Sequence, residues 1–402
     1  MTAIVGVLNK RAVAIAADSA MTVSNDGKTK IYNNTKKIFD ISPDIPVGIM
    51  VCGNLEFMST PWDVIISLYR EYRKGKAFHH LQDYSKDFIE FVRSCKFLQD
   101  PDAGRGYLIS ELGSFFYRIK ADVEERTKTE PDKPLQDLYR IVLQESIDMY
   151  REAGVSDEMK RFSYRQICKL SNDAFSALKD LIKEENCPLT DLDEWRKGYY
   201  EYLRSQCYLQ DSEIIFTGYG RKDAFPAIQS IIITGIVDGR VRYRYDTDDK
   251  IEINGSAFII PFAQTDVMMT LMKGISPNLY CHMIKTEEES VETARATIIE
   301  QLKADGVPDS IIEKVSGISF EELNSNYRDK AQEFIKANYV DGIIDAVDCF
   351  SVSEMAELAE NLILMTGLQR HFSSSEESVG GPVNVAVITK SDGFQWANTK
   401  TR

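Results

Sequence analysis

Three side chains near the start of the chain could together perform acyl transfer: Thr2, Asp18 and Lys37. A threonine hydroxyl is a weak nucleophile near neutral pH and needs a base beside it. If Met1 is removed, the α-amine of Thr2 can be that base, because an α-amine has a reference pKa of about 7.7–8.0. A neighbouring lysine ammonium would hold the amine neutral and ease formation of the alkoxide, and an aspartate would fix that lysine.

Each of these residues also has an ordinary interpretation. Thr2 can be merely the second residue, Asp18 a turn residue at the end of a strand, and Lys37 a solvated charge. Taken singly, none of the three indicates a catalytic site. The prediction depends on the elements that would bring them together.

Short strands are the elements predicted to position these side chains. Residues 4–8 and 12–17 are runs of apolar and small residues, separated by a turn short enough for a hairpin, and Asp18 ends the second run. Lys37 precedes residues 38–41, where apolar and polar residues alternate with the period of a strand. A further strand, residues 47–51, leads into Cys52 and Gly53.

The segments Thr2–Val7 (TAIVGV), Ala14–Ser19 (AIAADS) and Lys36–Ile41 (KKIFDI) together resemble the amino-terminal third of proteasome β-subunits and their bacterial relatives. These proteins are N-terminal-nucleophile hydrolases. The resemblance places the family's nucleophilic threonine on Thr2, its aspartate on Asp18 and its lysine on Lys37. It implies an α/β fold, a four-layer αββα sandwich.

The carboxyl-terminal segment carries a second part of the resemblance. After a polar stretch, Val379-Gly380-Gly381 leads into a strand and an Asp392-Gly393 turn, as in the same family. Counting back from the two glycines puts Glu376 at the family's aspartate position, and its serine position falls on Val379, next to Ser378. The family's oxyanion-donor glycine falls on Cys52, followed by Gly53, and a cysteine side chain there would narrow a peptide groove.

The rest of the chain divides into core segments and insertions. We expect the core in residues 1–77, 212–276 and 351–402, with helical insertions in 78–211 and 277–350. Within the first insertion, the aromatic and basic stretch from Trp195 to Tyr202 is predicted to be a helix face that packs on its own domain. In the second, capping-box spacing predicts helix starts at Thr286 and Ser319, and the acidic face is interpreted as a solvated surface.

Composition excludes several classes of function. A formal charge of −14 argues against a nucleic-acid or anionic-membrane surface, and no apolar run approaches the length of a membrane span. The seven scattered cysteines include no CxxC pair, which indicates reduced thiols in the cytoplasm. The four histidines lack metal-ligand spacing, so no metal site is expected. No cofactor is predicted either. Met1 leads straight into a strand pattern, and we expect no signal peptide.

These observations predict a threonine-type peptidase that hydrolyses amide bonds through an acyl-enzyme. Two alternatives stay open: an amidohydrolase of the same fold that acts on a small molecule, and a non-catalytic ring or scaffold subunit. The resemblance implies a peptide or protein substrate and a homo-oligomeric ring. The sequence identifies neither the substrate nor any AAA+ ATPase partner.

Overall fold

The computed structural model describes residues 2–25, 28–32, 35–209, 211–372 and 380–397. Helices and antiparallel strands both occur along the chain, so the mixed α/β class predicted from the sequence is confirmed. The four-layer arrangement stays a prediction. The chain divides into two compact units: Met1–Lys10, Ala14–Asn33 and Ile251–Val385 form the first, and Arg11–Val13, Asn34–Lys250 and Ala386–Arg402 form the second.

The main sheet of the second unit has the strand order β11-β10-β9-β6-β5, and its neighbouring strands are antiparallel. At the turn between β10 and β11, Asp238 and Gly239 both have positive φ, as a two-residue Asp-Gly hairpin turn requires. β13 pairs with β14 in the same unit. The bounds are β5 Ile38–Ser42, β6 Ile45–Gly53, β9 Ser212–Gly218, β10 Ala227–Val237, β11 Arg240–Lys250, β13 Asn384–Thr389 and β14 Gly393–Trp396.

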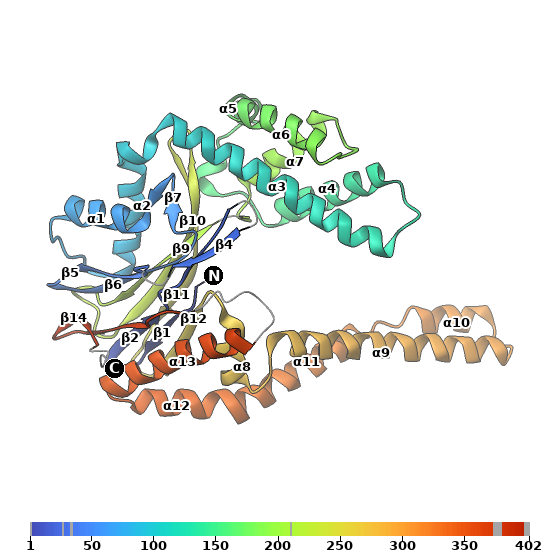
Figure 1. Ribbon diagram of the computed structural model, residues 1–402. Coiled ribbons are helices and arrows are strands. Elements are labelled where there is room, and N and C mark those ends of the chain that lie inside the picture. Colours follow the sequence, from blue (N-terminus) through green and yellow to red (C-terminus); the bar gives the residue numbers. More distant parts are fainter. Residues whose placement is uncertain (1, 26–27, 33–34, 210, 373–379, 398–402) are drawn as a thin grey trace. The chain divides into compact units, whose positions relative to one another are not determined.

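Two helices pack on this sheet, α1 (Trp62–Arg73) and α2 (Leu81–Ser94) (Figure 1). Their apolar residues recur at helical spacing and join one hydrophobic core with Val47, Ile214 and Phe216 of the sheet. Directly before α1, Thr60–Pro61 forms a short strand, β8, that pairs with β7 (Glu56–Phe57).

The helical segment predicted to be the first insertion has a hydrophobic core of its own. We call helices α3–α7 (Pro101–Arg204) the aromatic insertion, because Phe115, Phe116, Trp195, Tyr199 and Tyr202 are fully buried in its core. The prediction that the stretch from Trp195 to Tyr202 packs on its own domain is therefore confirmed. The helices are α3 Pro101–Thr129, α4 Leu135–Glu152, α5 Tyr164–Leu170, α6 Asn172–Glu184 and α7 Leu192–Arg204.

The first unit contains β12 (Phe258–Phe262), β1 (Ile4–Leu8) and most of β2 (Ala12–Ala17) as successive strands of one sheet. β1 and β2 have the predicted bounds and are completely buried. Between them, the Asn9 amide donates to the carbonyls of Val347 (2.9 Å) and Phe350 (3.0 Å), and so fixes the turn to the end of a helix. The remaining elements are β3 Met21–Asn25, β4 Lys28–Tyr32, α8 Thr265–Lys273, α12 Asp341–Cys349 and α13 Val352–Phe372.

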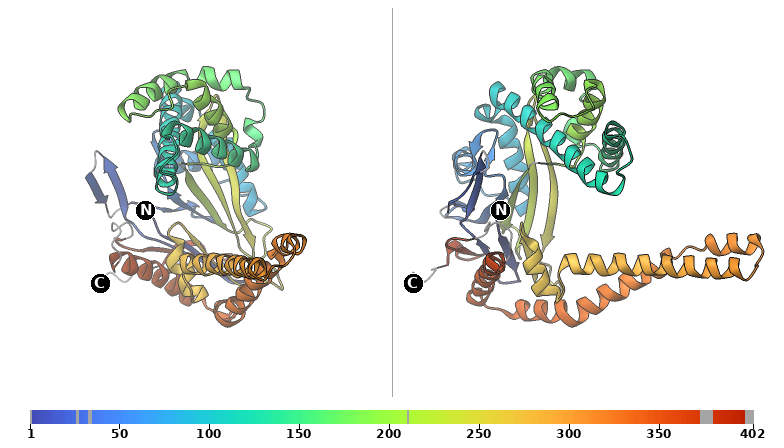
Figure 2. Two further views of the ribbon diagram at one scale, coloured as in Figure 1. Left: turned by 90° about the vertical axis from the view of Figure 1, so that its right-hand side faces the viewer. Right: turned by 45° about the vertical axis from the view of Figure 1, so that its right-hand side comes forward.

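The segment predicted to be the second insertion contains a helical hairpin in the first unit. We call α9 (Pro277–Ala304), α10 (Asp309–Ser316) and α11 (Glu321–Ile335) the acidic hairpin; Figure 2 shows α9 running beside the other two helices. The predicted helix start at Thr286 is wrong. The helix begins nine residues earlier, because Ser276 caps it by accepting from the Leu279 N–H (3.2 Å) and Pro277 suits its first position.

Candidate active site

Thr2 and Asp18 lie at the open end of the β1–β2 hairpin. The Asp18 N–H donates to the Ala3 carbonyl (3.1 Å), and the Asp18 carboxylate accepts from the Ala3 N–H (2.9 Å). Both predicted site residues are buried, with Thr2 6% and Asp18 1% exposed. The backbone on the carboxyl side of Thr2 is therefore held by a buried carboxylate fifteen residues further along the chain.

The second carboxylate oxygen of Asp18 contacts the carboxyl-terminal turn. It accepts from the Ala20 N–H (3.2 Å) and, at longer range, from the Gly380 N–H (3.4 Å). The Ser19 hydroxyl donates to the Pro382 carbonyl (2.7 Å). Three backbone N–H groups thus orient one carboxylate, and hydrogen bonds to a charged acceptor are among the stronger ones in proteins.

Two predicted residues next to this turn, Glu376 and Ser378, lie outside the described residues, as does Met1. The described part of the turn nevertheless brings two separate motifs of the sequence together. Asp18 of the AADS motif meets Gly380 of the VGG motif, although 362 residues separate them.

Lys37 lies in the second unit, directly before β5. Its carbonyl accepts from the Val51 N–H (3.0 Å), and the residue is 1% exposed. The ordinary interpretation of Lys37 as a solvated charge is therefore wrong. Burying an ammonium group is costly in free energy unless other groups compensate its charge, so such lysines commonly have a specific electrostatic role.

Cys52 lies inside β6, opposite Glu213 of β9. Its thiol donates to a Glu213 carboxylate oxygen (Sγ–Oε2 3.6 Å). Burial raises the pKa of Cys52 well above its usual value, and the charge of Glu213 raises it further, while Lys37 opposes these effects. Burial also raises the pKa of Glu213. Cys52 is thus a protonated thiol near neutral pH and a poor nucleophile.

Gly53 ends β6 in a conformation that suits glycine. Its φ is +82°, and a Cβ atom there would lie 2.5 Å from the Asp211 carbonyl oxygen. The next residue, Asn54, donates its N–H to that same oxygen (2.9 Å). The end of the strand is therefore held in place by contacts that a larger residue at position 53 would disrupt.

The backbone hydrogen bonds that β6 makes with β5 and β9 favour the N–H of Gly53 over that of Cys52 as an oxyanion donor. Backbone N–H groups alternate between the two sides of an antiparallel strand, and that of Val51 faces β5. The Cys52 N–H consequently faces β9, whereas the Gly53 N–H faces the β5 side. Because the pairing of β5 with β6 begins at Ile38 and Met50, Gly53 lies past the end of that pairing.

Sequence reasoning missed the role of Glu213 beside Cys52. The one available signal was an acidic residue at the start of an otherwise apolar strand, Glu213–Thr217.

Among the described residues, no group of three or more histidine, cysteine or acidic residues is arranged to hold a metal ion. No described helix is long and apolar enough to cross a membrane.

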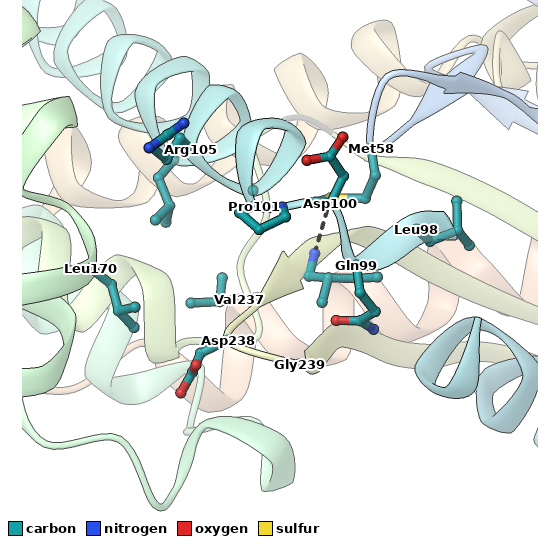
Figure 3. Close-up of a pocket in the computed structure, with 13 residues that line it drawn as sticks. Met58, Leu98, Gln99, Asp100, Pro101, Arg105, Leu170, Val237, Asp238 and Gly239 are labelled. Atoms are coloured by element: carbon teal, nitrogen blue, oxygen red, sulfur yellow. Dashed lines mark hydrogen bonds between the residues drawn. The ribbon is translucent and has the colours of Figure 1, made fainter. Parts of the chain in front are cut away.

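Each unit also contains a hollow. One in the first unit, of about 380 Å³, reaches Asp18 and is walled by Ile363, Leu364, Leu368 and Val383. The other, in the second unit, has about 350 Å³ and lies between the start of α3 and the β10–β11 turn (Figure 3). The second contains no predicted site residue, and its Met58 thioether accepts from the Ile236 N–H (3.3 Å).

No protein-family model matches the chain, and no curated protein matches it. Two solved structures of Anbu from Hyphomicrobium sp. strain MC1 are similar at 10% sequence identity, covering 99% of this chain and 85% of the other. The TM-scores are 0.30 for a Gly-1 mutant and 0.32 for a second crystal form, values too low to support conclusions about fold or function.

Proposed function

We propose that the chain is a threonine-type N-terminal-nucleophile hydrolase that cleaves amide bonds in a peptide or protein substrate. The observation that carries the proposal is the buried Asp18 carboxylate bonded to the Ala3 N–H, beside Thr2. The buried ammonium of Lys37 supports it, because a lysine without an electrostatic role would usually be solvated.

In the proposed reaction, removal of Met1 frees the α-amine of Thr2. The Thr2 hydroxyl attacks the substrate carbonyl, the α-amine takes the hydroxyl proton, and the Gly53 N–H donates to the developing oxyanion. The C–N bond then breaks and the leaving amine takes the proton, which leaves an ester on Thr2. Water, deprotonated by the same amine, attacks the ester and releases the acid, restoring the hydroxyl.

Lys37 and Asp18 have supporting roles in this proposal. A positive charge beside the α-amine disfavours its protonated form, so Lys37 would keep the base available near neutral pH. Asp18 would orient the start of β1 and balance the charge of Lys37. We further propose a cytoplasmic homo-oligomer, since closed symmetry is the usual state of homo-oligomers.

A second candidate is an amidohydrolase that acts on a small molecule. It is favoured by Cys52, whose side chain stands where the resembled family has glycine, and by the neighbouring Glu213 carboxyl. A peptide library assayed beside a panel of small amides separates the two candidates, because a peptidase should turn over the peptides at the higher kcat/KM.

Substitution of Thr2 tests the proposal. We expect Thr2→Ala to abolish turnover and Thr2→Ser to retain part of it, because serine keeps the hydroxyl. Thr286→Ala, in the acidic hairpin, is a matched control that should leave turnover unchanged. Full activity of Thr2→Ala with an unchanged thermal melt would place the chemistry elsewhere. An inactive wild type on every substrate would favour a scaffold role.

A further inference from the structure

The turn that follows β6 is exposed, yet two buried side chains of the same unit anchor it from beneath. Gly53 and Asn54 are exposed, whereas Ser212 and Trp62 are 2% and 3% exposed. The Asn54 carbonyl accepts from the Ser212 hydroxyl (2.8 Å) and from the Trp62 indole N–H (3.0 Å). Because water commonly satisfies the carbonyls of surface turns, two buried donors on one such carbonyl do more than satisfy it. They fix its position.

The two donors also bind each other. The Ser212 hydroxyl accepts from the Trp62 indole N–H (3.0 Å) while it donates to the Asn54 carbonyl, so the hydroxyl acts as donor and acceptor at once. The indole N–H is shared between the hydroxyl and the carbonyl, and the three polar atoms lie 2.8–3.0 Å from one another. Loss of either side chain should therefore displace the carbonyl.

The indole of Trp62 is itself held in place. Its ring packs against Phe57 (5.2 Å between centroids) and Phe88 (6.3 Å) in the core of the second unit. Its backbone N–H donates to the Leu55 carbonyl (3.1 Å), and β7 pairs with β8 in between. The segment from Asn54 to Trp62 is thus a short loop that is closed at its base and fixed to the hydrophobic core.

These contacts fix the backbone on both sides of Gly53. The Asn54 N–H donates to the Asp211 carbonyl (2.9 Å), and the Asn54 carbonyl is held as described, so both peptide groups after Gly53 are fixed. Before Gly53, the strand is held by its pairing with β9, which ends with Gly53 opposite Ser212. The direction of the Gly53 N–H is therefore set before any substrate binds.

We infer that Ser212 and Trp62 are positioning residues for the proposed hydrolysis, because through Asn54 they aim the Gly53 N–H at the developing oxyanion. The inference rests on the proposed function, which takes Gly53 as the oxyanion donor. A donor of fixed direction stabilises the developing charge without a cost of reorganisation. Because this contact strengthens only in the transition state, loss of either buried side chain should lower kcat and leave KM nearly unchanged.

The test uses the full-length protein and two substitutions that each remove one donor. Ser212→Ala removes the hydroxyl, and Trp62→Phe removes the indole N–H but keeps an aromatic ring in the core. The chain offers matched controls in Ser205→Ala and Trp195→Phe. They remove a buried hydroxyl and a buried indole N–H that donate to other backbone carbonyls of the second unit (2.9 and 3.0 Å). Either test variant is sufficient if the other does not fold.

Kinetics are measured on the fluorogenic peptide that wild type hydrolyses fastest, and thermal melts verify that each variant is folded. We expect Ser212→Ala and Trp62→Phe each to lower kcat by at least about tenfold, with KM and the kcat of both controls within about twofold of wild type. A peptide aldehyde, whose adduct with Thr2 places an oxygen where the oxyanion forms, should lose affinity by the same factor as kcat/KM. The double variant should be little worse than the poorer single one, since both donors act on one carbonyl.

The possible failures are distinguished by assaying Thr2→Ala in the same series. If Thr2→Ala is inactive while folded Ser212 or Trp62 variants keep the wild-type kcat, the inference is wrong and the proposed function stands. An equal loss of kcat in the controls, or a loss confined to KM, also overturns it, because the anchor would then serve stability or substrate binding. Full activity of Thr2→Ala, or no turnover by wild type, overturns the proposed function and the inference with it.

Discussion

The aromatic insertion and the acidic hairpin are both runs of helices between core segments, yet they are stabilised differently. In the aromatic insertion, α3 and α7 direct aromatic side chains inward, and Trp195 donates its indole N–H to the Leu189 carbonyl (3.0 Å). In the acidic hairpin, the corresponding large apolar residues, such as Ile298 and Phe334, are more than half exposed. Helical periodicity alone therefore does not distinguish helices that share a buried core from helices whose large apolar side chains stay exposed.

A buried ion pair adds to the contrast. Arg242 of β11 and Glu111 of α3, both almost completely buried, form an ion pair (2.9 Å), and Glu111 also accepts from the Tyr202 hydroxyl. This pair connects the aromatic insertion to the sheet of its own unit. The ion pairs of the acidic hairpin, such as Arg328–Glu288 (3.4 Å), are partly exposed and are expected to contribute little to stability.

The largest expected effect is on the core of the aromatic insertion. Trp195→Ala should lower the free energy of unfolding by about 4 kcal/mol, because it leaves a large cavity among packed aromatic rings. Denaturant unfolding followed by circular dichroism measures this loss. A cost below about 1 kcal/mol would mean that the insertion is not held together by this core.

A somewhat smaller effect is expected at the buried ion pair. Glu111→Gln should cost about 3 kcal/mol, because it leaves the Arg242 guanidinium buried without a charged partner. The double variant Glu111→Met with Arg242→Met should be more stable than Glu111→Met alone, since it removes both charges. If the double variant were the less stable one, Arg242 would be stabilised by its other contacts, such as the hydrogen bond that it donates to the Tyr107 hydroxyl.

The smallest effect is expected in the acidic hairpin. Phe334→Ser, at a side chain 61% exposed, should change the free energy of unfolding by less than about 0.5 kcal/mol in the isolated protein. The same denaturant series measures it beside Trp195→Ala. A large loss would show that Phe334 packs against another part of the chain, and the two helical segments would then not differ in the way described.

Local patterns were the predictable part of the fold. The strands at residues 4–8 and 12–17 match β1 and β2, because continuous apolar runs bounded by a short turn define both ends. The helix start at Thr286 was wrong, because its capping-box spacing also occurs inside a helix that Ser276 and Pro277 had already begun. Local spacing cannot tell these two situations apart.

Contacts between distant segments were beyond sequence reasoning. The pairing of Cys52 with Glu213 joins residues 161 positions apart, and only the strand register shows that this thiol points toward a carboxylate. The burial of Lys37 was equally hidden, because a lysine before a strand is usually solvated. The sequence named Thr2, Asp18 and Lys37 through their order and spacing, and the roles proposed for them remain predictions.

The most direct test of the central claim, that Thr2 is the nucleophile, is mass spectrometry of the protein after reaction with a threonine-directed electrophile. We predict a mass that lacks Met1 and carries one adduct, mapped by fragmentation to Thr2, with no adduct in a folded Lys37→Ala variant. Complete retention of Met1, or an adduct on another residue with Thr2 unmodified, would contradict it.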